Sequence, residues 1–203
     1  MTQKNPSEFI VLASASPRRK EILEGMGASF RIVTSNADES CSIADPIELT
    51  RELARRKAEA TFDELRRRGE NDGAIIISAD TVVAIDGKVL GKPHTKAEAI
   101  EMLSLLSGRS HTVCTGIAVT YRGVTYVDHS ATTVHVDTIP YGEILKYVDS
   151  GEPFDKAGGY GIQGGFSKWV SGIDGCYFGV VGLPVNKLCA LFHRVVGRYP
   201  DEI

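Results

Sequence analysis

The stretch Ala74-Ile-Ile-Ile-Ser78 is a continuous apolar run with three β-branched residues at its centre. A run of this length predicts a strand, and the lack of alternating polar residues predicts that both of its faces are buried. A strand covered on both faces favours an α/β fold, in which helices pack above and below a sheet. The run leads into Ala79-Asp80-Thr81, so we expect this carboxylate at the strand's C-terminal end, where open α/β sheets bind ligands.

Patterns typical of strands and helices alternate along the remaining chain, which also favours an α/β fold. Turn signals stand at Asp86-Gly87 and Arg122-Gly123. We expect strands at residues 9–12, 29–34, 74–78, 81–85, 88–90, 111–121 and 124–138. Helices are expected from Pro17, over about 45–68, from Thr95 to about 107, over about 140–150, and up to about Val196. The glycine-dense residues 152–165 indicate a functional loop or a glycine-opened helix. With no repeat or linker in its 203 residues, the chain is expected to form one domain over residues 1–203.

The stretch Ser14-Ala-Ser-Pro-Arg-Arg19 joins the first expected strand to the first expected helix. Pro17 suits the first helical turn, so backbone N–H groups and the positive end of the helix dipole point at whatever lies above this loop. Arg18 and Arg19 add guanidinium donors shaped for phosphate or carboxylate. The pattern therefore predicts an anion site. The competing interpretation is that Ser16 caps the helix and both arginines are solvated.

Composition excludes several classes of function. Net charge is −3, so there is no overall basic field to hold nucleic acid or an anionic membrane. The basic run Arg66-Arg-Arg68 is typical of cations at a helix C-terminus. The N-terminus is polar and no apolar run approaches the roughly eighteen residues of a spanning helix, so we expect neither secretion nor membrane insertion. The four cysteines are far apart and lack a Cys-x-x-Cys pair, so we expect free thiols in a reducing cytoplasm.

Six short motifs follow one another along the chain. They are Leu12-Ala-Ser-x-Ser-Pro-Arg-Arg19, Ala79-Asp-Thr81, Gly91-Lys-Pro93, Leu106-Ser-Gly-Arg-x-His111, Asp155-Lys-Ala-Gly-x-Tyr-Gly-Ile-Gln163 and Val181-Gly-Leu-Pro184. In this order they resemble the signatures of the Maf family of house-cleaning nucleoside triphosphate pyrophosphatases, over about residues 9–196. The resemblance implies a mixed, elongated, twisted sheet flanked by helices in two lobes with a central cleft, a fold related to the inosine triphosphate pyrophosphatases. It also implies a homodimer.

The resemblance further implies a reaction in which water attacks the α-phosphorus of a nucleoside triphosphate and releases pyrophosphate. It makes Asp80 the proton acceptor, and Glu39 with Asp80 the ligands of Mg²⁺ or Mn²⁺. The phosphate-binding residues that it implies are Ser14, Arg19, Lys57 and Lys92. These residue types suit the reaction, because the phosphate oxygens need cations and the water needs a carboxylate.

Three positions indicate the substrate branch within the resemblance. The branch acting on dTTP and UTP resembles Ser-Pro-Arg-Arg, Asp-Thr and a late Gln, and this chain has Arg18, Thr81 and Gln163. The branch acting on 7-methyl-GTP resembles Ser-Pro-Trp-Arg, Asp-Gln and a late Glu. A Gln amide offers both a donor and an acceptor to the imide edge of uracil or thymine. We therefore expect preference for dTTP and UTP, with the 7-methyl-GTP branch as the alternative.

Other classes of function have weaker support. A phospho-ligand binding module that acts in cell division without turnover would bind nucleotides and release no pyrophosphate. A Rossmann-type dinucleotide enzyme is disfavoured, because no Gly-x-Gly-x-x-Gly follows the first strand. Nucleophilic catalysis by Cys114 or Cys176 with His111 is disfavoured, because no feature lowers the pKa of either thiol and His111 is expected to be structural.

Overall fold

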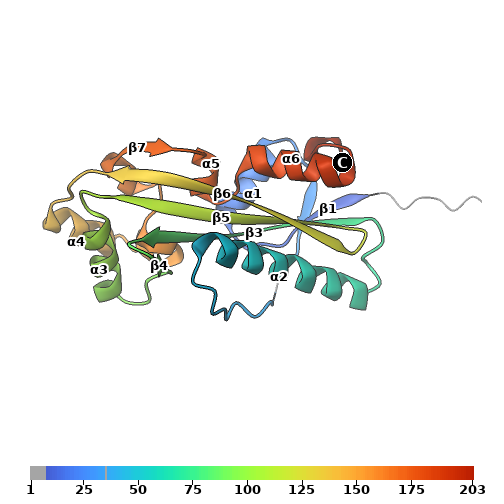
Figure 1. The fold of residues 1–203 in the computed structure, drawn as a ribbon, viewed down its shortest axis with the longest axis horizontal. Helices are drawn as coiled ribbons and strands as arrows, with labels where there is room; N and C mark the ends of the chain where they lie inside the picture. Colours follow the sequence, from blue (N-terminus) through green and yellow to red (C-terminus); the bar gives the residue numbers. More distant parts are fainter. Residues whose placement is uncertain (1–7, 35) are drawn as a thin grey trace, which may run out of the picture.

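The computed structural model describes residues 8–34 and 36–203. A seven-stranded sheet runs through the molecule in the order β2-β1-β3-β5-β6-β7, with β4 paired to β3 (Figure 1). The strands are β1 (Phe9–Leu12), β2 (Phe30–Ile32), β3 (Ala74–Ile85), β4 (Lys88–Leu90), β5 (Ser110–Tyr121), β6 (Val124–Val136) and β7 (Val170–Asp174). Strand β1 is parallel to β2 and β3, and all other pairs are antiparallel. The predicted mixed α/β sheet is confirmed.

Helices cover both faces of this sheet. They are α1 (Pro17–Gly25), α2 (Pro46–Arg67), α3 (Lys96–Leu106), α4 (Tyr141–Asp149), α5 (Tyr177–Val181) and α6 (Val185–Val196). Helix α2 lies along β3 and β5 on one face, while α6 packs on the other face at the same end (Figure 1). Helices α3 and α4 lie at the opposite end of the long strands β3, β5 and β6.

The apolar core is divided between the two ends of the sheet, which confirms the expected two lobes. In the first lobe, the even-numbered residues of β3 such as Ile76 face α2 in one cluster. Odd-numbered residues such as Ile75 and Ile77 face α1 and α6 in a second cluster. In the second lobe, Val83 and Ile85 join residues of α3, α4 and the glycine-dense stretch. Because successive side chains of a strand point to opposite faces, β3 contributes to every one of these clusters.

Strand β3 differs from the prediction. We expected one strand over residues 74–78, with Asp80 just beyond its C-terminal end, and a second strand over residues 81–85. Residues 74–85 instead form one strand, and Asp80 lies opposite Gly116 in its middle. Asp80 is nevertheless accessible from one side of the strand, because of how the neighbouring strands pair. Strand β1 pairs with residues 74–77 of β3 and β4 pairs with residues 83–85, so residues 78–82 pair with β5 alone. The edge of β3 beside Asp80 is therefore open.

Local sequence signals account for most element boundaries. Asp45 caps α2, because its Oδ1 accepts from the backbone N–H of Ile47 at 3.0 Å and of Glu48 at 2.8 Å. Thr95 caps α3 through the N–H of Glu98 at 3.2 Å. Positive φ angles at Asp86, Gly87, Arg122 and Gly123 form the two tight hairpin turns.

Some segments were not predicted. Strand β7 and helix α5 are each only five residues long, too short to show a clear period. The glycine-dense stretch and the residues after it form three short 3₁₀ turns, η1 (Glu152–Asp155), η2 (Ala157–Gly159) and η3 (Gly165–Trp169). The stretch is therefore a loop with short 3₁₀ turns and not a glycine-opened α-helix, and its functional role stays a prediction.

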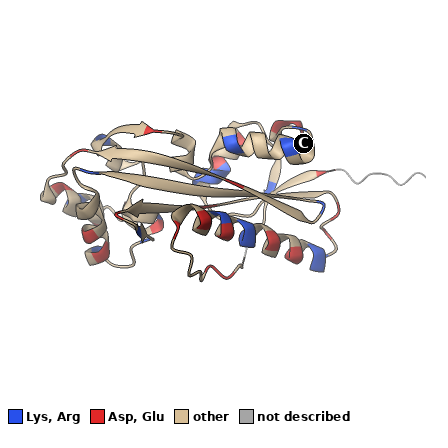
Figure 2. Cartoon of the chain, viewed as in Figure 1, with Lys and Arg blue, Asp and Glu red and all other residues tan. Residues whose placement is uncertain are grey.

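Charged side chains on α2 are paired with one another. Acidic and basic residues alternate along its exposed side (Figure 2), and Arg55 contacts both Glu52 at 2.8 Å and Glu59 at 2.9 Å. The basic run at the end of α2 is likewise paired, since Arg67 and Arg68 both contact Glu64. This supports the interpretation of a solvated helix end. No helix in residues 8–34 and 36–203 is long and apolar enough to cross a membrane.

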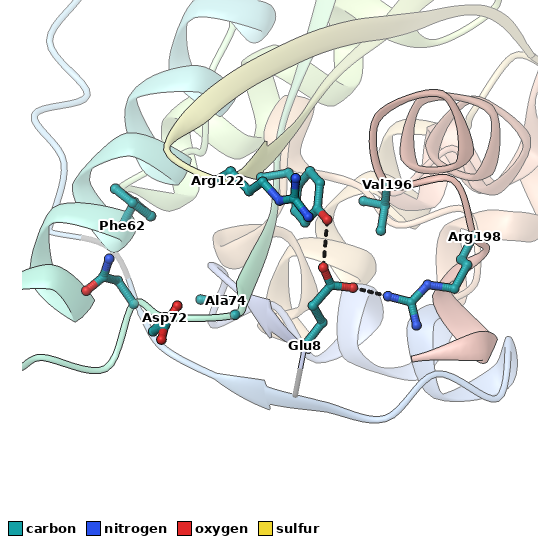
Figure 3. Close-up of a pocket in the computed structure, with 10 residues that line it drawn as sticks. Glu8, Phe62, Asp72, Ala74, Arg122, Val196 and Arg198 are labelled. Atoms are coloured by element: carbon teal, nitrogen blue, oxygen red, sulfur yellow. Dashed lines mark hydrogen bonds and ion pairs between the residues drawn. The ribbon is translucent and has the colours of Figure 1, made fainter. Parts of the chain in front are cut away.

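The end of the first lobe holds a cavity of about 860 Å³ between Glu8, at the start of β1, and the turn that precedes β3 (Figure 3). Within it, Glu8 Oε1 accepts from the Tyr121 hydroxyl at 2.6 Å, and Glu8 also pairs with Arg198. Arg122 lies over the Tyr121 ring at 4.9 Å from its centroid. These contacts tie the start of β1 to the β5–β6 hairpin and to the end of α6.

Helix α2 approaches β5 most closely at Gly116. A Cβ atom there would lie 2.3 Å from both the backbone carbon and the oxygen of Thr50. The φ angle of Gly116 is not positive, so the requirement for glycine at this position is steric. Because Gly116 pairs with Asp80, the same close contact fixes the distance of α2 from the open edge of β3.

We therefore predict that Gly116→Ala forces α2 away from the sheet and lowers the free energy of unfolding by about 1–3 kcal/mol, the usual cost of overpacking. Urea denaturation measures this loss. The matched control is Gly142→Ala in α4, where a Cβ would meet nothing within 4 Å. Equal stabilities for the two variants would contradict the predicted contact.

Candidate active site

A cleft of about 890 Å³ opens at the unpaired edge of β3. Its walls come from the loop between β1 and α1, from α2, from residues 80–83 of β3, from the loop after β4, and from the glycine-dense stretch. All the predicted site residues line it: Ser14, Arg18, Arg19, Glu39, Lys57, Asp80, Thr81, Lys92 and Gln163. Asp80 and Thr81 point to opposite faces of β3, and the open edge lets one cleft reach both.

Arg19 joins three of the sequence motifs. Its Nε donates to the carbonyl of Gly182 at 2.8 Å, Nη1 to the Ser14 hydroxyl at 3.2 Å, and Nη2 to the Thr81 hydroxyl at 3.1 Å. Burial lowers the pKa of Arg19, while the charge of Asp80 opposes that shift. Arginine stays protonated in proteins, so a fixed positive charge lies at the base of the cleft.

A chain of hydroxyl groups continues from Arg19 into the sheet. Thr81 Oγ1 lies 2.9 Å from Thr115 Oγ1, and Thr115 donates to the carbonyl of Gly179 at 2.8 Å. A hydroxyl has only one hydrogen, and Thr115 donates it to the carbonyl of Gly179. Thr115 therefore accepts the hydrogen bond from Thr81. Thr81 thus accepts from Arg19 and donates to Thr115, which fixes the direction of its hydroxyl.

Arg18 crosses the cleft. Its Nη1 contacts Asp155 Oδ2 at 3.1 Å, and so links α1 to η1 in the other wall. Ser16 stands at the N-cap of α1, yet its side chain makes no capping bond. The competing interpretation, a capping Ser16 with two solvated arginines, is therefore wrong, and the first turn of α1 keeps uncapped N–H groups beside the cleft.

Lys57 on α2 brings two carboxylates together. Its Nζ lies 2.5 Å from Asp80 Oδ1 and 3.2 Å from Glu39 Oε1. The Lys57 and Asp80 side chains are only 14% and 12% exposed, whereas Glu39 is 64% exposed. Ser78 Oγ donates to the carbonyl of Ala54 at 2.5 Å, which holds α2 against β3 one turn from Lys57.

Lys92 and Gln163 extend into the cleft from opposite loops. Both residues are exposed, and within residues 8–34 and 36–203 neither side chain makes a hydrogen bond or ion pair. They are therefore free to contact a ligand.

Charge in the cleft is nearly balanced. The cations that line it are Arg18, Arg19, Lys57, Lys92 and Lys156, and the carboxylates are Glu39, Asp80, Glu152 and Asp155. Five positive and four negative groups leave a single net positive charge. A polyphosphate carries several negative charges, so this site needs further cations in order to neutralise one.

Sequence reasoning missed several of these residues. Glu152, Asp155 and Lys156 received no role, although all three belong to the glycine-dense stretch and line the cleft. Thr115 was also missed, because a threonine within an apolar strand has no distinctive pattern. For Glu152, Asp155 and Lys156, the available signal was the presence of charged residues within a glycine-dense stretch.

The cysteine alternative has no support in the geometry. Burial raises the pKa of the Cys114 thiol, and the Cys176 Sγ accepts from the N–H of Gly179 at 3.3 Å. His111 is buried, and its Nε2 lies 2.7 Å from the Tyr160 hydroxyl. Burial, with a smaller contribution from His135, lowers the pKa of His111 to about 4. His111 therefore acts as a neutral core residue that anchors Tyr160.

Comparisons with known proteins find related sequences over nearly the whole chain. A family model described as Maf-like protein matches residues 9–195. A dTTP/UTP pyrophosphatase from Thermococcus kodakarensis is 48% identical over 193 residues, covering 94% of this chain and 100% of that protein. Proteins of the same name from Desulforamulus reducens and Clostridium acetobutylicum are each 46% identical, cover 88% of this chain, and are themselves covered to 92% and 94%.

The hydroxyl chain generates a stability prediction. Thr81→Val keeps the shape of the side chain but leaves the Arg19 donor and the Thr115 acceptor without their partner. We expect the free energy of unfolding to fall by about 1–3 kcal/mol, the cost of unsatisfied buried groups. Thr81→Ser retains the hydroxyl and should lose less than half of that amount in the same denaturation experiment. Equal losses would show that the methyl group, and not the hydroxyl, stabilises this position.

Proposed function

This chain belongs to the Maf-like protein family, and we propose that it hydrolyses dTTP and UTP to the nucleoside monophosphate and pyrophosphate. The proposal rests on one observation above all. At the open edge of β3, Asp80 and Glu39 share the ammonium group of Lys57, and the first turn of α1, which carries Arg18 and Arg19, lies across the same cleft. The names of the relatives support the choice of pyrimidine nucleotides.

Asp80 is the base in this proposal. Its carboxylate is nearly buried and is held by Lys57 through Oδ1, so its orientation is fixed before substrate arrives. It accepts a proton from the water that attacks the α-phosphorus, and the α–β anhydride bond breaks with its electrons leaving on pyrophosphate. Lys57, already against Asp80, stabilises the negative charge that builds on the phosphoryl oxygens.

The remaining cations bind the triphosphate. The Arg19 guanidinium has five N–H donors. Three of them donate to Ser14, Thr81 and Gly182, so two remain for phosphate oxygens. The uncapped N–H groups at the N-terminus of α1 add partial positive charge, which attracts the negatively charged phosphates. Lys92 reaches from the loop after β4 and neutralises the pyrophosphate that leaves.

A divalent metal ion fits this site, and we propose Mg²⁺ or Mn²⁺ held by Glu39 and Asp80. These carboxylates already converge on one positive group, Nζ of Lys57. The described residues contain no cluster of three or more His, Cys, Asp or Glu side chains, which suits Mg²⁺ because it keeps several waters and uses few protein ligands. When bound, the ion supplies positive charge to the phosphate oxygens, which the cleft by itself lacks.

The pyrimidine preference is assigned to Arg18, Thr81 and Gln163. Gln163 lines the cleft, and its amide makes no hydrogen bond within the described part of the chain, which suits the carbonyl–NH–carbonyl edge of uracil and thymine. The Thr81 hydroxyl already bonds to Arg19 and Thr115, so we infer that Thr81 affects the substrate by holding Arg19 in place. Arg18 acts from α1 in the opposite wall, and its guanidinium reaches across the cleft to Asp155.

We further propose that residues 1–203 act as one catalytic domain, since one sheet runs through both lobes. A homodimer is proposed because β2 and β7 end the sheet and each leaves an edge for pairing. The cytoplasm is the proposed location, in line with four free cysteines. Nucleic acid and membranes are not expected partners.

A panel of nucleoside triphosphates tests the function. Pyrophosphate release is measured with UTP, dTTP, CTP, ATP, GTP and 7-methyl-GTP, first with Mg²⁺ and then with EDTA. We expect the highest kcat/KM for UTP and dTTP, and loss of activity in EDTA. Asp80→Asn should lower kcat by about 10³-fold, within the usual range for loss of a general base.

The control is the melting temperature of Asp80→Asn, which should match that of the wild type. A preference for 7-methyl-GTP over UTP would contradict the substrate assignment alone. Nucleotide binding without pyrophosphate release would instead support the binding module. An Asp80→Asn variant with most of its kcat intact would remove Asp80 from the role of base.

A further inference from the structure

The carboxylate of Glu152 lies inside the bend of the loop that carries Gln163. Glu152 Oε2 accepts from the backbone N–H of Gly165 at 3.0 Å, and Oε1 accepts from the Tyr147 hydroxyl at 3.0 Å. The Tyr147 oxygen in turn accepts from the N–H of Gly161 at 3.3 Å. One carboxylate and one phenol therefore hold both ends of the loop 161–165.

The glycines of this loop fit the carboxylate sterically. A Cβ at Gly164 would lie 1.8 Å from Glu152 Oε1 and 2.5 Å from Cδ. The φ angle of Gly164 is −99°, which any residue can adopt, so glycine is required here by space and not by backbone conformation. A Cβ at Gly161 would lie 2.7 Å from Cε of Lys156, which packs beside Glu152. The loop is thus wrapped around the side chains of Glu152 and Lys156.

Tyr147 itself is held firmly. It extends from α4, and its ring packs against Phe166 with centroids 5.6 Å apart. Burial raises the pKa of its hydroxyl, which keeps the proton available for donation to Glu152. Phe166 also contacts Tyr160, at 4.5 Å between centroids, and Tyr160 is anchored by His111. The network therefore reaches the core of the second lobe.

Gln163 lies between the two anchored ends of the loop and has an exposed side chain. Among the described residues, no side chain bonds to the backbone of Gln163. The position of Gln163 therefore depends on the anchored glycines on either side of it, Gly161 and Gly165. We propose that Glu152 is a positioning residue for base selection: together with Tyr147 it fixes the loop 161–165, and thereby sets Gln163 against the imide edge of the pyrimidine. This inference rests on the proposed function and deepens it.

Two measurements on Glu152→Ala test the inference. The first is amide hydrogen exchange of the peptide that contains residues 161–165, which we expect to accelerate by about tenfold, since a lost hydrogen bond of about 1.4 kcal/mol has that effect. The second is the ratio of kcat/KM for UTP to that for CTP, whose base presents an amino group in place of one carbonyl. This ratio should fall by about tenfold, mainly through a higher KM for UTP.

Asp149→Ala is the matched control. Asp149 belongs to the same lobe, ends α4, and is an exposed carboxylate paired with Lys96 at 2.6 Å. We expect it to change neither the exchange of residues 161–165 nor the UTP/CTP ratio. Glu152→Gln, which keeps one of the two acceptors, should lie between the wild type and Glu152→Ala in both readouts.

The outcomes separate the inference from the proposed function. A wild-type protein without pyrophosphate release from any nucleotide would contradict the proposed function, whatever the exchange data show. Unchanged exchange of the loop 161–165 in Glu152→Ala would overturn the positioning role by itself. Faster exchange with an unchanged UTP/CTP ratio in an active enzyme would overturn the link to base selection. A fall in kcat without a rise in KM would likewise show that Glu152 does not act through substrate binding.

Discussion

The cleft exists because one edge of β3 loses its partner for five residues. Strand β1 pairs with β3 as far as Ile77, and β4 pairs with β3 from Val83 onward. Between these residues the central strand passes from one lobe to the other paired only with β5. A strand in the middle of a sheet normally pairs with a strand on each side. Here one side has no strand over these residues, so that side is open to a ligand. Consecutive side chains then serve opposite faces: Asp80 faces α2, and Thr81 faces Arg19.

The contacts around this edge share a common design. Lys57 holds Asp80 on one face, and Arg19 holds Thr81 on the other. Each functional side chain is thus paired with a cation from a helix that packs on its own side of the sheet. The close approach of α2 at Gly116 and the bond from Ser78 to Ala54 keep Lys57 at that distance. Preorganised charges of this kind need little rearrangement during a reaction.

Much of this could be predicted from the sequence, because it depends on local signals. Asp45, Thr95 and the Asp86-Gly87 turn fix their elements through neighbouring residues, and the prediction is confirmed there. The residues to which the family resemblance assigns roles all line one cleft. The features that the sequence did not predict depend on contacts between residues far apart in the chain. The continuity of β3 through Asp80 depends on pairing with β5 some 35 residues away in sequence, and the Thr115 and Glu152 contacts join segments whose proximity no short pattern reveals.

Hydrolysis of UTP in H₂¹⁸O under single-turnover conditions tests the central claim most directly, namely that Asp80 activates water for attack at the α-phosphorus. Mass spectrometry of the products should find the ¹⁸O atom in the monophosphate and none in the pyrophosphate. Label in pyrophosphate would place the attack at the β-phosphorus. Label in the carboxylate of Asp80 would show that Asp80 is a nucleophile and not a base, and either result would contradict the account.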